Sequence, residues 1–120
     1  MAGFPVPGHL QGTSFVPLLT NPDTAWKTAA FSQFLLGRYS RTKTIKDEMM
    51  GYSIRTNQYR YVEWYSWNKE ENKKGEILSN ELFDHHVDPQ ENKNLANDAG
   101  HKETVDLLSR QLTRGWSHSR

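Results

Sequence analysis

Two neighbouring segments, MGYSIRT at residues 50–56 and YRYVEWYSW at residues 59–67, carry the strand pattern that decides the fold. Both are rich in aromatic and β-branched residues, which favour β-strands. From Tyr52 to Thr56 bulky and small or charged residues alternate, as in a half-buried strand. Two residues separate the segments, so we predict an antiparallel hairpin. Because this turn lacks glycine, we expect Asn57 to adopt a positive φ.

The segments on either side of the hairpin predict further strands and one helix. Residues 26–36 fit a short helix or a strand equally well, and residues 76–83 predict another short strand. The last element, at residues 100–114, is predicted to be a helix because Val105, Leu108 and Leu112 form one apolar stripe. The expected fold class is therefore α+β, an antiparallel sheet with the C-terminal helix packed on one face.

The ends of the helix and the segments between the strands show ordinary boundary signals. Asn97 or Asp98 can cap the start of the helix, and Gly115 fits its end. The segments 37–48 and 69–74 are charged and nearly free of apolar residues, so we expect exposed loops.

The N-terminal 24 residues contain recurrent proline and glycine, which excludes a long helix or a central strand. Within them FVPLL at residues 15–19 is apolar. We expect this stretch to lie as a loop-like segment on a core, and a disordered tail is the alternative.

Length and composition limit the classes of function. A chain of 120 residues suffices for one domain, and its net charge of +1 gives no general attraction to nucleic acid or anionic membrane. The absence of cysteine excludes disulfides and thiolate sites. No run of apolar residues approaches the ~20 that a membrane-spanning helix needs. We therefore expect neither nucleic acid nor membrane as a partner.

Three collinear segments carry a resemblance to a known family. PVPGHLQGTSFVPLL at residues 5–19, the hairpin at residues 50–64 and ELFDHHVDPQENKNLA at residues 81–96 are similar to the C-terminal portion of iduronate-2-sulfatase-like sulfatases. The resemblance implies a four-stranded antiparallel sheet with a C-terminal helix. It also implies that residues 1–24 are an extended segment leaving a catalytic domain, and that residues 25–120 form the C-terminal subdomain packed on that domain.

The same resemblance implies that this chain is not catalytic alone. Sulfatases act through a formylglycine, made within a Cys/Ser-x-Pro-x-Arg motif, beside a divalent cation that is usually calcium. No such motif occurs here, because the proline of SFVP at residues 14–17 comes one place too late. We therefore expect no catalytic residue, metal ligand or cofactor in this chain. Family members are usually exported, periplasmic or lysosomal, and this sequence leaves the localisation open.

The loop after the strand-like segment contains the candidate substrate residues Arg38, Arg41 and Lys43. In the family this loop reaches the rim of the active site, and guanidinium groups pair well with sulfate and carboxylate oxygens. Relatives often continue with Pro-Arg where this chain has LLGR at residues 35–38. A solvated basic loop without a ligand is the alternative.

Other residues of chemical interest have simpler structural explanations. His85 and His86 with Asp84 and Asp88 could bind a metal, but we expect the aspartates to form turns. The aromatic hairpin could stack on bases or sugars, but a sheet core is the simpler reading. Glu63 is expected to pair with an arginine or to face solvent.

The sequence is also compatible with two other functions. The first is a free-standing carbohydrate-binding or protein-interaction module, which the aromatic hairpin and the basic loop would serve. The second is an independent hydrolase using Asp84, His85 or His86. The sequence also predicts an apolar docking face, and hence self-association of the isolated chain, with residues 4–19 exchanged between copies.

Overall fold

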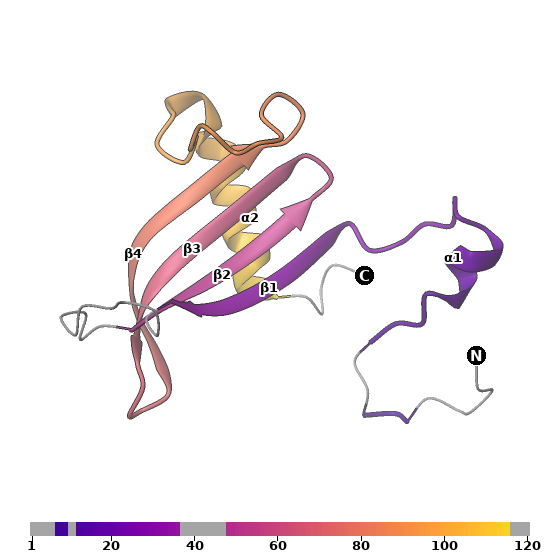
Figure 1. Cartoon of the computed structure of the whole chain (residues 1–120), viewed down its shortest axis with the longest axis horizontal. Coiled ribbons are helices and arrows are strands. Elements are labelled where there is room, and N and C mark those ends of the chain that lie inside the picture. Colours follow the sequence, from indigo (N-terminus) through magenta and orange to yellow (C-terminus); the bar gives the residue numbers. More distant parts are fainter. Residues whose placement is uncertain (1–6, 10–11, 37–47, 116–120) are drawn as a thin grey trace.

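The computed structural model describes residues 7–9, 12–36 and 48–115 and shows a four-stranded antiparallel sheet with a helix on one face (Figure 1). The strands pair in sequence order, β1-β2-β3-β4. The α+β class, the antiparallel sheet and the C-terminal helix are thus confirmed. The elements are α1 (Val16–Thr20), β1 (Ala29–Leu36), β2 (Glu48–Thr56), β3 (Tyr59–Asn68), β4 (Lys73–Asp84), the 3₁₀ helix η1 (Ala99–His101) and α2 (Lys102–Arg114).

The predicted hairpin is confirmed as β2 and β3, with Ile54 opposite Tyr61. Its turn differs from the prediction, since Asn57 is not among the described non-glycine residues with positive φ. The Thr56 hydroxyl oxygen instead closes the turn by accepting a hydrogen bond from the Tyr59 backbone N–H at 2.9 Å. A side-chain acceptor here removes the need for a left-handed residue.

The other strands resolve what the sequence left open. Residues 29–36 of the ambiguous segment form the edge strand β1, in which Phe31 pairs with Ile54. The strand predicted at residues 76–83 is confirmed but is longer, because β4 begins at Lys73 and includes residues expected in the loop. Pairing with the neighbouring strand decides both outcomes, and local periodicity cannot report it.

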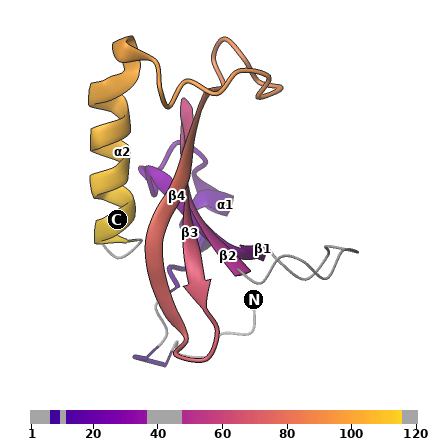
Figure 2. The ribbon, with the colours of Figure 1, turned by 90° about the vertical axis from the view of Figure 1, so that its left-hand side faces the viewer.

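The hydrophobic core lies between the sheet and α2, which packs along one face (Figure 2). Ile54, Tyr61 and Leu82 are adjacent on β2, β3 and β4 and are at most 1% exposed. Leu108 of α2 and Leu95 complete this core. Val105 and Leu112 pack against it, so the predicted apolar stripe of the helix is confirmed.

The boundaries of the helix follow the predicted signals. The Asp98 carboxylate accepts a hydrogen bond from the Gly100 N–H at 2.8 Å and caps η1, which leads directly into α2. Gly115 ends α2 with φ at 78°, a conformation that glycine adopts without strain.

A buried carboxylate also joins the helix to the sheet. Glu63 is 3% exposed and accepts hydrogen bonds from the hydroxyls of Tyr61 (3.0 Å), Tyr65 (2.6 Å) and Ser109 of α2 (2.6 Å). Burial, and then the hydrogen bond to Glu63, raises the pKa of Tyr65, so its hydroxyl remains a donor. The expectation that Glu63 faces solvent or pairs with an arginine is therefore wrong.

The N-terminal segment contradicts one expectation. Residues 16–20 form the short helix α1, which tolerates Pro17 in its first turn and lies apart from the sheet (Figure 1). Phe15 is 59% exposed and Leu19 65% exposed, so this apolar stretch does not lie on the core of the chain. Helix α2 already covers the sheet face on which the core lies. No helix in the described parts of the chain is long and apolar enough to cross a membrane.

Truncating Leu82 to alanine tests this account of the core. The side chain is fully buried between β3 and α2, so Leu82→Ala should lower the free energy of unfolding of the 120-residue chain by about 2–5 kcal/mol. Leu107 on α2 is 50% exposed, and Leu107→Ala should change the same quantity by less than about 0.5 kcal/mol. Urea unfolding measures both, and equal losses would contradict the placement of the core.

Candidate functional site

The face of the sheet opposite α2 carries an aromatic pair that crosses strand β2. The rings of Phe34 on β1 and Trp64 on β3 meet edge to face, with centroids 4.9 Å apart and planes at 88°. Gly51 lies between them in the register. A Cβ atom at Gly51 would stand 3.0 Å from both rings, so glycine is what allows them to meet. Leu36 follows two residues after Phe34 on the same face. We call Phe34, Trp64 and Leu36 the aromatic ridge.

Charged residues of the same face lie beside the ridge. The Trp64 indole N–H donates a hydrogen bond to Glu81 at 3.2 Å. Further along, the guanidinium of Arg60 makes a bidentate hydrogen-bonded ion pair with Glu91 and lies 4.9 Å from the centroid of the Phe83 ring. These contacts join β3 to the loop after β4 and hold both charges in fixed positions.

His85 completes this polar cluster. Its Nε2 lies 2.6 Å from Oε1 of Glu91. Hydrogen bonds from Arg60 lower the pKa of the Glu91 carboxyl, burial opposes the shift, and the bond to His85 adds to it. Sequence reasoning missed the cluster because Arg60 and Glu91 are 31 residues apart and no local pattern links them.

The aspartates of the following loop form turns, as predicted. Asp84 accepts hydrogen bonds from the His86 backbone N–H and the Gln58 amide, both at 2.9 Å. Burial alone would raise the pKa of Asp84, but these hydrogen bonds lower it. Asp88 accepts from the Lys93 backbone N–H at 2.9 Å. Within the described residues no group of three or more histidine, aspartate or glutamate side chains is placed to hold a metal ion.

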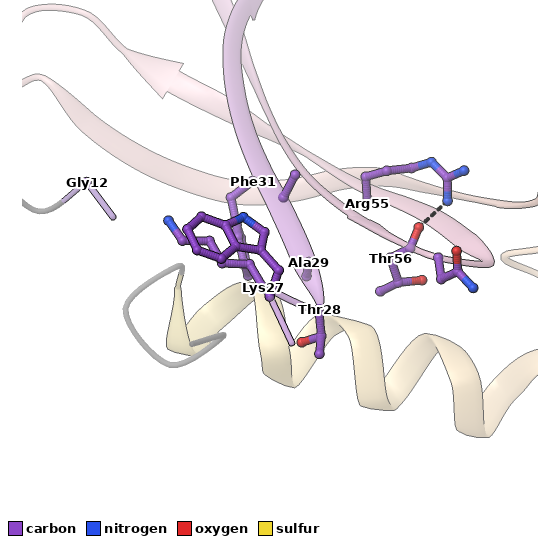
Figure 3. A pocket seen from close by; sticks show the side chains of 10 residues that line it. Gly12, Lys27, Thr28, Ala29, Phe31, Arg55 and Thr56 are labelled. Atoms are coloured by element: carbon purple, nitrogen blue, oxygen red, sulfur yellow. Dashed lines mark hydrogen bonds between the residues drawn. The ribbon is translucent and has the colours of Figure 1, made fainter. Parts of the chain in front are cut away.

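A pocket of about 920 Å³ opens at the start of β1, and Trp26, Lys27 and Arg55 are among the residues that line it. Figure 3 shows Lys27 and Arg55 at this pocket. The Arg55 guanidinium is held by the backbone carbonyls of Thr56 and Tyr59, the latter at 3.3 Å. The charged residues that line this pocket in the described chain are both cations. A pocket lined by an indole ring and two cations suits an anionic sugar, but it was not foreseen, because Arg55 is distant in sequence from Trp26 and Lys27.

The predicted substrate residues Arg38, Arg41 and Lys43 lie outside the described residues. Strands β1 and β2, which flank their segment, are paired, with Leu36 opposite Met49. The substrate role of the three cations stays a prediction.

Comparison with known proteins gives the class to which this fold belongs. The family model described as "N-sulphoglucosamine sulphohydrolase, C-terminal" matches residues 1–117. The chain therefore belongs to this family and is a sulfatase C-terminal subdomain. A search of the curated proteins finds no match.

A solved structure supports the same class. It is the structure of BT4656 in complex with its substrate D-glucosamine-2-N,6-O-disulfate, with a TM-score of 0.67 and 25% sequence identity. The match covers 93% of this chain and 20% of the BT4656 chain, so the present chain spans about a fifth of that protein's length. The resemblance to sulfatases is confirmed at the level of the sulfatase C-terminal subdomain.

The Glu91 cluster predicts a pH dependence of stability. The pKa of Glu91 is lower in the folded state than in the unfolded one. The ion pair of Arg60 with Glu91 therefore stabilises the fold above about pH 5, and this stabilisation is lost as the pH falls. Glu91→Gln should therefore destabilise the chain at pH 7, and its stability should change less than that of the wild type between pH 7 and pH 3.

Urea unfolding of both proteins at the two pH values measures this difference. Glu76→Gln, at an exposed position of β4, is the matched control and should follow the wild type. A Glu91→Gln variant with the full pH dependence of the wild type would contradict the assigned role of the pair.

Proposed function

We propose that this chain is the C-terminal subdomain of a sulfuric-ester hydrolase that acts on sulfated glycans, of the iduronate-2-sulfatase type. Residues 1–24 leave the catalytic domain, and residues 25–120 pack on it and shape the rim of its substrate site. The observation that carries the sulfated-glycan part of the proposal is the match over 93% of this chain to one fifth of a protein whose substrate is a sulfated glucosamine.

The chain does not supply the chemistry itself. Its sequence contains no Cys/Ser-x-Pro-x-Arg motif, and the described residues contain no group of side chains placed to hold a metal ion. The formylglycine and the divalent cation, usually calcium, that the family uses do not fit any residues described here. In this proposal they belong to the catalytic domain, and this chain contributes binding groups and packing.

The binding groups are the cations of the segment between β1 and β2. Arg38, Arg41 and Lys43 lie within six residues of one another. Arginine recognises sulfate and carboxylate oxygens through paired hydrogen bonds, and lysine adds a point charge. Their proposed role is to hold anionic groups of the glycan at the rim.

The most specific part of the proposal is the type of sulfate ester that the enzyme hydrolyses. The segments at residues 50–64 and 81–96 resemble iduronate-2-sulfatase-like enzymes, which favours a 2-O-sulfated uronic acid. The family description and the BT4656 complex name sulfated glucosamine for those proteins. The two substrate classes differ in the sugar and in the position of the ester, so an assay separates them.

Expressing the chain joined to its upstream coding region tests the proposed activity. We expect the joined protein to release sulfate from a disaccharide with a 2-O-sulfated uronic acid, and the 120-residue chain to release none. Release only from N- or 6-O-sulfated glucosamine would replace the iduronate type by the glucosamine type. No release by the joined protein, together with salt-sensitive binding of heparan-type oligosaccharides by the chain alone, would instead support a free-standing binding module.

Replacing the rim cations tests their role. In the joined protein Arg38→Gln, Arg41→Gln and Lys43→Gln together should raise KM about tenfold or more and leave kcat nearly unchanged, because the lost contacts bind substrate and transition state alike. Lys93→Gln and Lys102→Gln remove exposed cations elsewhere and should leave KM unchanged. An unaltered KM in the triple variant would contradict the substrate role of Arg38, Arg41 and Lys43 and would support a solvated basic loop without a ligand.

A further inference from the structure

We infer that the pocket at the start of β1 is a second anion-binding subsite, which binds an anionic sugar of the glycan through Trp26, Lys27 and Arg55. This inference rests on the proposed function, and it adds a binding site to the rim residues named there. The pocket volume of about 920 Å³ falls within the range of about 300–1,000 Å³ that is usual for small-molecule sites.

The pocket lies at the opposite end of β1 from the rim segment. It opens where β1 begins at Ala29, whereas the segment that contains Arg38 follows the end of β1 at Leu36. An extended strand rises about 3.3 Å per residue, so the two ends of β1 are about 23 Å apart. The pocket and the beginning of the rim segment are therefore two separate places on the subdomain.

The charge that lines the pocket is positive and is not neutralised within the described chain. Lys27 and Arg55 are its charged lining residues there, and neither makes an ion pair with a described residue. Arg55 lies directly opposite Arg60 in the register of β2 and β3. Glu91 neutralises Arg60, but no described carboxylate pairs with Arg55. Like charges opposite each other in a sheet are destabilising, and an anionic ligand at Arg55 would relieve this repulsion.

The guanidinium of Arg55 is held in place by the chain itself. Its Nη1 donates hydrogen bonds to the backbone carbonyls of Thr56 and Tyr59, and Figure 3 shows the first of these. Nε and Nη2 make no hydrogen bond to a described residue. Two N–H groups on one edge of a guanidinium can pair with two oxygens of a carboxylate or sulfate. Because the donor is already fixed, binding loses less side-chain entropy.

The other lining groups suit a sugar better than a bare anion. The side chain of Trp26 is 36% exposed and offers an apolar face together with an N–H donor. The side chains of Trp26, Thr28 and Asn57 make no hydrogen bond to a described residue, so they are available to sugar hydroxyl groups. A ligand that uses the whole lining carries an anionic group, hydroxyl groups and an apolar ring face. A sulfated or carboxylated sugar combines all three.

Hydroxyl-radical footprinting of the joined protein tests the subsite at Trp26. A sulfated disaccharide of the heparan type should lower the oxidation of Trp26 severalfold at saturation, because the bound sugar excludes water from the indole. Trp64, whose indole N–H donates to Glu81, is the internal control and should keep its oxidation rate. Unchanged oxidation of Trp26 would overturn the inference.

Two further probes test the class of ligand. A neutral disaccharide should not protect Trp26 at the concentration at which the sulfated one does, because it has no anionic group for Lys27 and Arg55. Inorganic sulfate should not protect Trp26 either, because a free ion leaves the indole face uncovered. Equal protection by either probe would overturn the assignment of the pocket to an anionic sugar.

Removal of the charges gives a second measurement. Lys27→Gln and Arg55→Gln should each raise the disaccharide concentration needed for half-protection of Trp26 about tenfold, since each removes a charge-assisted hydrogen bond. Lys27 is exposed and makes no ion pair with a described residue, so its replacement leaves the turn that Arg55 holds intact. Lys102→Gln, at another exposed position, is the matched control and should change nothing. Equal values for Lys27→Gln and Lys102→Gln would contradict the role of the pocket cations.

Release of sulfate is measured separately from protection of Trp26. An active joined protein in which Trp26 stays reactive contradicts only the subsite. An inactive joined protein in which the disaccharide protects Trp26 contradicts only the proposed function.

Discussion

One helix can cover only one face of a four-stranded sheet, and this constraint shapes the whole subdomain. Helix α2 covers the face on which Ile54, Tyr61 and Leu82 lie side by side, and it leaves the opposite face without a helix. Glu63 also ties the helix to the sheet on this face, because the Ser109 hydroxyl on the helix donates a hydrogen bond to the buried Glu63 carboxylate. The position of α2 is thus fixed by an apolar stripe and by one hydrogen bond.

Apolar side chains remain exposed on both faces of the sheet and on α1. The matched structure is about five times as long as this chain. In the proposed function the packing of the subdomain on the catalytic domain sets the position of the segment between β1 and β2 relative to the active site.

The sequence predicted the elements whose patterns are local. The β2–β3 hairpin followed from alternation and from the short turn, and α2 from its stripe of Val105, Leu108 and Leu112 with Gly115 at its end. Strand β1 remained ambiguous because its pairing with β2, and not its own period, makes it a strand. Burial of the stretch from Phe15 to Leu19 was wrongly predicted, since hydrophobicity does not state whether the covering surface lies in the same chain.

The candidate site was less predictable because its contacts are long-range. Arg60 and Glu91 come from a strand and from a distant loop, and the meeting of Phe34 with Trp64 depends on Gly51 in a third segment. The environment of Glu63 likewise combines β3 with α2. The turn-forming aspartates were predicted correctly, because their partners are the next few backbone amides.

The most direct test of the central claim is the DNA sequence immediately upstream of the codon for Met1. If this chain is a sulfatase C-terminal subdomain that works only with its catalytic domain, the upstream sequence encodes, in frame, a Cys/Ser-x-Pro-x-Arg motif and aspartates for a divalent cation. A stop codon preceded by no sulfatase-like sequence would contradict the claim, and the chain would then function without a catalytic domain.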